Sequence, residues 1–301
     1  MPVMADYQRC RAGNWHLTVL AGQWNRELQE KILALVDRQP PSKHPQTFAL
    51  ASGGDHESKP LYLKVFYPPP GIVILKNLLR KSKAARFLHQ GLALAEAGFH
   101  APATIAAGET RRWSFSQRAF VLTVGVGGQS LVSYLHDCWS GRRPQLALAE
   151  KRKALKCLAE VIRNFHDRGF VHGDLVPSNL FVAERQFGGS AFYFMDNDRT
   201  RHYWPWLPQS LWKRNLVQLN RFPLPGISLQ DRLRFFLAYS GRRTCGARER
   251  NLLRWLELRT RRRRRECDHA GATGSFRMLM RWTPEVMHAE QMIGAPKRVE
   301  E

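Results

Sequence analysis

The stretch that decides the fold is His172-Gly173-Asp174-Leu175-Val176-Pro177-Ser178-Asn179, which Phe194-Met195-Asp196 follows. It places a carboxylate and a carboxamide five residues apart, and a second carboxylate 17 positions after the amide. Between them, two apolar runs flank the glycine pair Gly188-Gly189 and predict a β-hairpin. Because a hairpin returns the chain to its starting point, we expect Asp174, Asn179 and Asp196 to lie close together.

These three side chains have the chemistry that phosphoryl transfer requires. A carboxylate must orient and deprotonate the acceptor hydroxyl, and hard oxygen ligands must hold Mg²⁺ against the β- and γ-phosphates. Asp174 suits the base, and Asn179 and Asp196 suit the metal. Asp and Asn are also common in ordinary loops. The surroundings favour a kinase-like catalytic loop, because an amphipathic helix that ends at Gly169 precedes it and an apolar strand carries Asp196.

An earlier strand, Leu61-Tyr62-Leu63-Lys64-Val65-Phe66, carries a single lysine among apolar neighbours. Lys64 fits the strand lysine that binds the α- and β-phosphates of ATP. A solvated strand lysine is the alternative. Kinases pair this lysine with a carboxylate on the next helix, yet the chain has no Asp or Glu between Glu57 and Glu96.

The order of the predicted elements gives an α+β, protein-kinase-like fold with two lobes. Strands are predicted near 17–20, 48–51, 61–67, 104–107 and 119–124, with a helix at about 77–97 among them. Helices dominate later, including one that opens at a capping box formed by Ser228 and Asp231. We predict a small β-rich N-terminal lobe at 1–124 that grips the nucleotide, and a hinge at 125–129. A larger, mainly helical catalytic lobe with a basic C-terminal region follows at 130–301.

Two positions differ from the pattern of protein kinases. Gly173 stands where an arginine would tether a phosphorylated activation loop, and Asn197-Asp198 replaces the Phe-Gly that follows the metal aspartate. No phosphorylation switch is therefore implied. The His-Gly-Asp usage is typical of phosphotransferases that act on sugars, aminoglycosides and other small hydroxyl compounds.

From Leu61 to Leu258 the sequence resembles the bacterial lipopolysaccharide core kinases, which phosphorylate heptose or 3-deoxy-octulosonic acid (Kdo) in the inner core. Besides the catalytic stretch, the resemblance rests on Tyr62-Leu63-Lys64, Lys81-Ser82-Lys83-Ala84, Gly98-Phe99-His100-Ala101-Pro102, Met195-Asp196-Asn197-Asp198-Arg199, Leu219-Asn220-Arg221 and Asp231-Arg232-Leu233-Arg234-Phe235. It implies ATP and Mg²⁺ as cofactors, with Asp174 as base, Lys64 on the nucleotide, and His172 in support. Asn179 and Asp196 would hold the metal.

The charge of the chain indicates a polyanionic partner. Arg and Lys number 47 against 25 Asp and Glu, which gives +22, and residues 197–265 alone carry 18 − 4 = +14. The densest part holds Arg261, Arg262, Arg263, Arg264 and Arg265, and Trp204, Trp206 and Trp212 precede it. Tryptophan beside cations suits the interface of an anionic membrane. We expect these arginines to contact the membrane or an anionic glycolipid substrate, although a solvated basic helix end with buried tryptophans is the alternative.

The sequence contains no apolar run near the roughly 20 residues of a membrane-spanning helix, and no secretory signal. We therefore expect a cytoplasmic chain bound peripherally to the inner membrane. The five cysteines are odd in number and lack CxxC spacing, which disfavours a disulfide framework or a zinc knuckle.

Three other functions stay open. A nucleic-acid-binding protein has only the charge in its favour, so no nucleic acid partner is expected. A membrane-bound pseudokinase would explain the missing helix carboxylate. A kinase of a soluble small molecule, similar to aminoglycoside or choline kinases, would use the same catalytic residues but leave the arginine run unexplained.

Overall fold

The structure is a computed structural model, and it describes residues 6–42, 44–50, 59–67, 81–112, 115–139, 144–184, 190–203, 208–221, 227–270 and 297–298. The chain divides into two compact units. Unit 1 comprises Met1–Gly127, Asp196–Arg199 and Pro296–Glu301, and unit 2 comprises Gly128–Met195 and Thr200–Ala295. None of the helices in the described ranges combines the length and the apolar character needed to cross a membrane.

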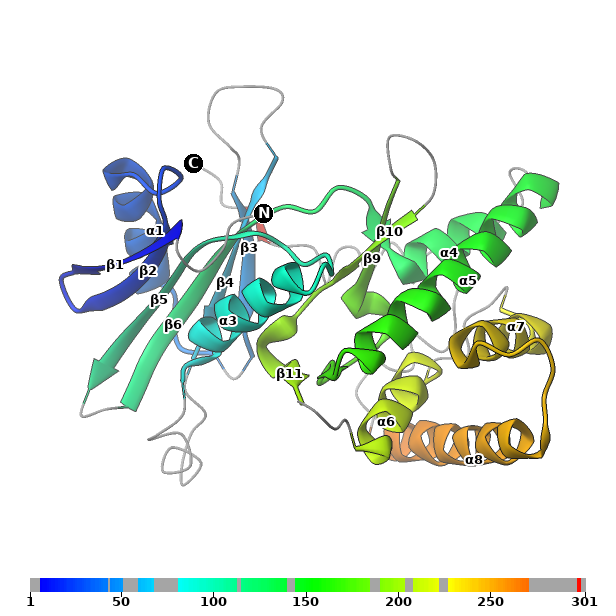
Figure 1. Cartoon of the computed structure of the whole chain (residues 1–301). Coiled ribbons are helices and arrows are strands. Elements are labelled where there is room, and N and C mark those ends of the chain that lie inside the picture. The colour runs from blue at the N-terminus through cyan, green and yellow to red at the C-terminus, as the bar shows by residue number, and fades with distance from the viewer. Residues whose placement is uncertain are drawn as a thin grey trace. The chain divides into compact units, whose positions relative to one another are not determined.

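Unit 1 is built on one sheet with the strand order β1-β2-β5-β6-β4-β3-β12 (Figure 1). The strands are β1 (Tyr7–Ala12), β2 (Trp15–Leu20), β3 (Gln46–Leu50), β4 (Leu61–Phe66), β5 (Thr104–Arg112), β6 (Phe115–Val124) and β12 (Lys297–Arg298). Neighbouring strands run antiparallel, except that β12 pairs with β3 in parallel. The sheet contains all five predicted strands, and β1 is an addition that the sequence did not suggest.

Two helices cover opposite faces of this sheet, α1 (Arg26–Arg38) and α3 (Lys83–Glu96). Leu63 and Val65 of β4 are fully buried in the cluster that also contains Ile32 of α1. Phe66 lies in the other cluster, with side chains of α3. Because side chains alternate along a strand, Lys64 projects from β4 on the same face as Phe66, toward the side of α3.

Unit 2 is mainly helical and contains two small sheets (Figure 1). Its elements are β7 (Gln129–Ser130), α4 (Leu131–Trp139), α5 (Pro144–Asp167), β8 (Phe170–Val171), η2 (Pro177–Asn179), β9 (Leu180–Glu184), β10 (Ser190–Phe194), β11 (Arg201–His202), α6 (Gln209–Leu219), α7 (Leu229–Ser240) and α8 (Ala247–Ala270). The hairpin predicted from the sequence is present, since β9 and β10 pair antiparallel with Leu180 opposite Phe194.

Gly169 ends the helix α5 as the sequence predicts, and it also admits a close backbone neighbour. Its φ is +80°, which favours glycine, and an added Cβ would collide with the carbonyl oxygen of Tyr203. Tyr203 N–H donates to the Gly169 carbonyl at 2.8 Å, and β11 pairs with β8. The start of the catalytic stretch is therefore held by the segment that follows it at positions 201–203.

The helix α7 is joined to α5 by a buried ion pair. Lys151 Nζ of α5 lies 3.0 Å from Asp231 Oδ2, and the two side chains are 10% and 3% exposed. Asp231 also forms the capping box with Ser228 that the sequence predicted. Burial acts to raise the pKa of Asp231, but the hydrogen bonds from Lys151 and Ser228 outweigh it and hold this pKa below its ordinary value.

The short helix η3 (Asn197–Arg199) belongs to unit 1, whereas the sequence boundaries placed these positions in the C-terminal lobe. It packs against α3, and Asp196 just before it pairs with Lys64 of β4. These contacts with unit 1 account for the difference. Whether residues 125–129 act as a hinge stays a prediction.

Candidate functional site

The loop between β8 and β9 carries Asp174 and Asn179 in unit 2. Val176 N–H and the Asn179 side-chain Nδ2 both donate to the Asp174 carbonyl oxygen at 2.9 Å. Asn179 N–H in turn donates to the Val176 carbonyl, which closes the turn η2. These hydrogen bonds hold the backbone between Asp174 and Asn179 in one conformation. Because Nδ2 is engaged, Oδ1 is the amide atom suited to a cation.

His172 ties this loop to the end of β10. Its ring is 1% exposed, and Nε2 lies 2.8 Å from the Met195 carbonyl oxygen. A carbonyl only accepts, so Nε2 carries the proton, and Nδ1 is then the acceptor for the Asp174 N–H at 3.1 Å. The hydrogen bonds thus assign a neutral His172 that holds the backbone of Asp174 and of Met195, the residue preceding Asp196. Its supporting role in catalysis stays a prediction.

Two amides of α6 hold the backbone of the same loop. Asn215 is fully buried, accepts from the His172 N–H at 3.0 Å and donates to the His172 carbonyl at 2.6 Å. Gln218 donates to the Gly173 carbonyl at 3.1 Å and accepts from the Leu175 N–H at 3.3 Å. Neither residue was predicted from the sequence. Their spacing of three places them on one helix face, but an amide pair in a polar helix is equally typical of an exposed surface.

His166 supports the amide pair from α5. Its Nε2 donates to Asn215 Oδ1 at 3.2 Å, and its Nδ1 lies 2.9 Å from the Tyr239 hydroxyl. Burial lowers the pKa of His166 to about 4, although the hydrogen bond with Asn215 acts in the opposite direction. The imidazole is therefore neutral at pH 7, which leaves Nδ1 to accept from Tyr239.

In unit 1 the structure brings Lys64 and Asp196 together. Lys64 Nζ lies 2.5 Å from Asp196 Oδ1, and the side chains are 23% and 41% exposed. Asp196 has a φ of 54°, in the left-handed region that few residues other than glycine adopt. The lysine that lacks a carboxylate on the following helix thus pairs with the carboxylate that the sequence analysis assigned to the metal.

Asp198 and Lys83 are close to this pair and were not assigned a role from the sequence. Lys83 lies in the first turn of α3, and its Nζ is 5.8 Å from the Phe66 ring centre, compared with 5.5 Å for Lys64. Asp198 is 7% exposed. Burial and the charge of Asp196 raise the pKa of Asp198, whereas Lys64, Arg199 and Lys83 act to lower it.

The predicted site residues therefore form two groups. Lys64 and Asp196 meet within unit 1, and His172, Asp174 and Asn179 meet within unit 2. Met195 joins the groups along the chain, because its N–H donates to the Asn179 carbonyl at 2.9 Å and Asp196 is the next residue. The convergence of all four kinase residues on one ATP stays a prediction.

The donor atoms fit Mg²⁺. Asp196 offers a partly exposed carboxylate and Asn179 a carboxamide oxygen, and hard oxygen ligands are those that this cation prefers. Across the described ranges, no three His, Cys, Asp or Glu side chains group as a metal site. Whether the two groups bind one cation together with the nucleotide phosphates stays a prediction.

The arginine run lies on α8, and its members differ in their contacts. Arg261 pairs with Glu257 at 2.7 Å, and Arg262 and Arg263 pair with Glu266 at 3.0 and 3.1 Å. Arg264 instead donates to the carbonyl oxygens of Asn220 and Arg221 at 2.7 and 2.9 Å, just after the end of α6. Arg264 is therefore structural. Its neighbours in the run, including Arg265, are exposed.

Of the three tryptophans expected at the membrane, Trp204 and Trp206 lie outside the described residues. Trp212 is half-buried and its ring lies 6.0 Å from that of Tyr239. A further tryptophan, Trp255, is 37% exposed on α8, one turn before Leu258, which is 68% exposed. The exposed aromatic and aliphatic groups of α8 thus adjoin the arginine run.

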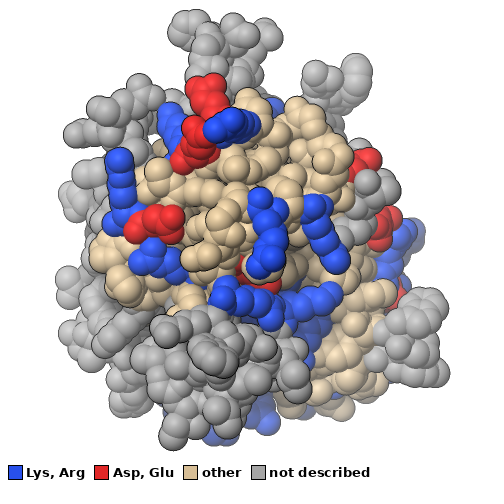
Figure 2. Space-filling model, turned by 90° about the vertical axis from the view of Figure 1, so that its left-hand side faces the viewer, with Lys and Arg blue, Asp and Glu red and all other residues tan. Residues whose placement is uncertain are grey.

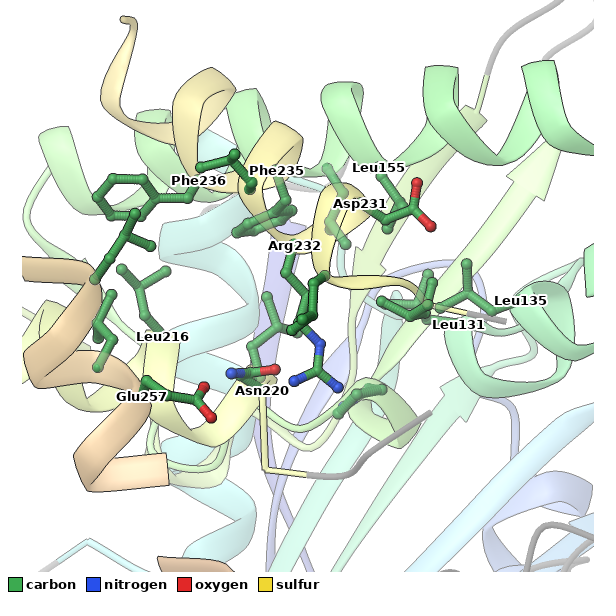
Figure 3. A pocket seen from close by; sticks show the side chains of 18 of the residues that line it. Leu131, Leu135, Leu155, Leu216, Asn220, Asp231, Arg232, Phe235, Phe236 and Glu257 are labelled. Atoms are coloured by element: carbon green, nitrogen blue, oxygen red, sulfur yellow. The ribbon is translucent and has the colours of Figure 1, made fainter. Parts of the chain in front are cut away.

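Unit 2 also contains an apolar cavity of about 380 Å³. Figure 3 shows Leu131, Leu135 and Leu155 around it, with Arg232 and Glu257 among its few charged groups. Leu229 and Leu233 line it as well, and they are 78% and 41% exposed. The cavity therefore reaches the surface through apolar side chains of α7.

Lys and Arg side chains gather on one face of the molecule, whose net charge is +22 (Figure 2). Figure 2 shows basic side chains gathered around a hollow in the middle of one face. Unit 1 contains a hollow of about 580 Å³ between the strands β1, β2 and β5 and the start of α3. Its basic lining residues are Arg9, Arg11, Lys81 and Arg111, and Glu109 pairs with Arg111 at 2.9 Å.

Comparisons with known proteins agree with this architecture. The solved structure of WaaP in complex with acyl carrier protein superposes with a TM-score of 0.54 at 19% identity, covering 77% of this chain and 92% of that one. This superposition confirms the protein-kinase-like fold predicted from the sequence. The kinase domain of Mycobacterium tuberculosis PknI is a weaker match, with a TM-score of 0.34 at 13% identity, covering 82% of this chain and 79% of that one.

At the level of sequence, no curated protein matches the chain. The model of the lipopolysaccharide kinase (Kdo/WaaP) family matches residues 76–239, which include Asp174, Asn179 and Asp196. This match spans more than half of the chain. The resemblance inferred from the catalytic stretch is confirmed, and the chain belongs to the lipopolysaccharide kinase (Kdo/WaaP) family.

Proposed function

We propose that the protein transfers the γ-phosphoryl group of ATP, with Mg²⁺, to a heptose or Kdo hydroxyl of the lipopolysaccharide inner core. The observation that carries this proposal is the meeting of Lys64 with Asp196, which are 132 positions apart. The sequence predicts that Lys64 binds the ATP phosphates and that Asp196 binds Mg²⁺. Membership of the kinase family and the fixed Asp174–Asn179 loop support the same reaction.

In the proposed reaction, Asp174 accepts the proton of the acceptor hydroxyl as the oxygen bonds to the γ-phosphorus. The bond from that phosphorus to the bridging oxygen breaks, and ADP leaves. Lys64 would bind the α- and β-phosphates, and Asn179 and Asp196 would hold Mg²⁺, which neutralises charge on the phosphates. His172, Asn215 and Gln218 keep the Asp174 loop in place through the hydrogen bonds described above.

The test is phosphoryl transfer from ATP to purified lipopolysaccharide core acceptors. Asp174→Asn keeps the size of the side chain but removes the base, and we expect it to lower turnover by about 10² to 10⁴-fold. Serving as a control, Asp37→Asn changes an exposed aspartate of α1 and should have no effect. Unchanged turnover in Asp174→Asn would place the base elsewhere. Transfer to soluble sugars alone would favour the small-molecule kinase, and nucleotide binding without transfer would favour the pseudokinase.

The acceptor glycolipid places the reaction at the cytoplasmic face of the inner membrane, where we propose that the protein binds peripherally. The helix α8 supports this proposal, because Trp255, Leu258, Arg259 and Arg262 recur at the spacing of one helix face. Trp255 and Leu258 are exposed, and Arg259 lies 5.5 Å from the Trp255 ring centre. An apolar stripe beside cations suits the headgroup region of an anionic bilayer.

The apolar cavity of unit 2 favours a second partner, an acyl carrier protein. WaaP has been solved in complex with such a protein, and a cavity of about 380 Å³ lined by leucines could take an acyl chain. Leu135→Trp, which adds bulk to the lining, should weaken co-purification with acyl carrier protein bearing a long acyl chain. Equal binding of the chain-free carrier would contradict this role for the cavity.

A further inference from the structure

Lys64 pairs with Asp196, although the proposed function requires Asp196 to bind Mg²⁺. Its ammonium pairs with the Asp196 carboxylate, and that carboxylate is the proposed metal ligand. An Asp196 engaged as a ligand cannot also neutralise Lys64 to the same extent. The following helix α3 offers no carboxylate in its first turn, and its one acidic residue is Glu96 at the C-terminal end.

Asp198 is the nearest replacement along the chain. It lies two residues after Asp196 in η3, which packs against α3, and it is almost fully buried. Lys64 and Lys83 act on it electrostatically, and their ammonium groups both lie within 6 Å of the Phe66 ring centre. Two lysines and two carboxylates therefore share a small, partly dry region of unit 1, where charges interact more strongly than in bulk water.

We propose that Asp198 is a positioning residue that holds Lys64 when Asp196 serves as a metal ligand. This inference rests on the proposed function. Asp198 takes the part that a helix carboxylate has in other kinases, and Lys83 adds a second positive charge beside the two carboxylates. The pairing of Lys64 with Asp196 then gives way to a pairing of Lys64 with Asp198.

Direct measurement of nucleotide binding tests this exchange without any acceptor. The wild-type protein and Asp198→Asn are titrated with ATP, once with Mg²⁺ and once with EDTA. We expect Asp198→Asn to raise the dissociation constant about 10-fold with Mg²⁺, because Lys64 has lost its second partner. With EDTA the change should stay within about twofold, since Asp196 still pairs with Lys64. Asp37→Asn serves as the control for loss of an aspartate in unit 1.

A double-mutant cycle shows whether Asp198 acts through Lys64. In a Lys64→Met background, Asp198→Asn should change the dissociation constant by less than about twofold, because the group that it positions is gone. Asp198→Glu keeps the charge and should recover part of the affinity. The thermal unfolding midpoint is measured for each variant, and Asp198→Ser, which removes the charge without added bulk, replaces Asp198→Asn if that variant does not fold.

The outcomes separate this inference from the proposed function. A wild-type protein that binds no ATP·Mg²⁺ would overturn both. Wild-type binding with equal affinity in Asp198→Asn would overturn the role of Asp198 alone, as would an effect of the same size in EDTA or in the Lys64→Met background. A 10-fold loss that depends on Mg²⁺ and on Lys64 would establish it.

Discussion

Asp196 pairs with Lys64 and also has an unusual backbone conformation. Its φ of 54° lies in the left-handed region, which aspartate and asparagine tolerate better than most side chains. Asp196→Asn should therefore keep the backbone while weakening metal binding, so that turnover recovers in part as Mg²⁺ is raised. Asp196→Ala loses both properties and should recover less. A defect in Asp196→Asn that is indifferent to Mg²⁺ concentration would argue against the ligand role.

His166 gives the protein a pH-dependent stability. Its pKa is about 4 in the folded chain and 6.5 when unperturbed, so below pH 6.5 the unfolded chain binds a proton that the folded chain does not. The free energy of unfolding should therefore fall as pH drops from 6.5 toward 4, by about 3 kcal/mol in all. Denaturant unfolding at pH 7 and pH 4.5 measures this change.

His166→Gln is the matched control for that experiment. It keeps a hydrogen-bond donor and acceptor but does not titrate, so it should lose less stability than the wild type between the two pH values. We expect it to be the less stable protein at pH 7, because the imidazole fits between Asn215 and Tyr239. Parallel pH profiles for the two proteins would assign the acid sensitivity to other groups.

The contact between Asn179 and the Asp174 backbone could be predicted from the sequence, because five positions of one loop separate the two residues. The residues that hold them could not. Asn215 and Gln218 are polar side chains in a polar helix, and their burial depends on how α6 packs on the loop. Asp198 lies in the motif Met195-Asp196-Asn197-Asp198-Arg199, but its burial next to two lysines depends on the packing of η3 against α3.

At the scale of elements, the Lys151–Asp231 pair fixes α7 to α5. Asp231→Ala should lower the free energy of unfolding by about 3 kcal/mol or more, because it removes a buried carboxylate that lies 3.0 Å from the buried Lys151 ammonium. Ser228→Ala, which removes only the helix cap, should cost about 1 kcal/mol. The double variant Lys151→Met with Asp231→Leu should recover much of the loss, as an apolar pair needs no partner charge.

An exposed ion pair on α5 provides a comparison with the buried Lys151–Asp231 pair. Arg163 and Asp167 lie 3.3 Å apart with side chains 46% and 66% exposed. Asp167→Asn should cost less than about 1 kcal/mol, since solvent screens this pair. If denaturant unfolding gave equal losses for Asp167→Asn and Asp231→Ala, burial would not be the source of the effect.

Most elements could be predicted, and two of the misses in unit 1, β1 and α1, differ in kind. The edge strand β1 is exposed along most of its length, so it has no alternation of apolar and polar residues to reveal it. The helix α1 has readable signals, because Asn25 caps it and Ile32 and Val36 recur on one buried face. These signals at positions 25–38 are sufficient to predict the helix.

For the whole molecule, the net charge of +22 predicts binding to anionic vesicles that weakens with salt. Arg264 must stay, because it holds the end of α6. Replacement of Arg261, Arg262, Arg263 and Arg265 by glutamine should weaken vesicle binding by at least about 10-fold, as each cation near the bilayer contributes on the order of 1 kcal/mol. Activity should fall more on membrane-embedded acceptor than on a soluble sugar fragment.

A second variant separates location from total charge. Four exposed cations lie on and just after α5, namely Arg152, Lys153, Lys156 and Arg168. Their replacement by glutamine removes the same number of positive charges as the α8 variant. Vesicle binding should then stay near the wild-type value. Equal losses in the two variants would show that only the overall charge matters, and survival of binding in the α8 variant would exclude the run as the membrane contact.

The fold of the whole chain could be predicted because the catalytic stretch is specific to one architecture, and the remaining elements were consistent with it. The cavity of unit 2 could not, since its lining comes from several helices whose apolar residues look like ordinary core. Hydrophobic periodicity shows which face of a helix is buried but not whether the space beside it is filled.

The amide contacts between α6 and the Asp174 loop have a consequence for protein synthesis. Asn215 follows His172 by 43 positions, so the loop leaves the ribosome before the helix that holds its backbone exists. A nascent chain that ends before Gln209 carries Lys64, Asp174, Asn179 and Asp196, yet the loop lacks its acceptors and donors from Asn215 and Gln218. The loop that carries Asp174 therefore gains these backbone hydrogen bonds only after α6 has been synthesised.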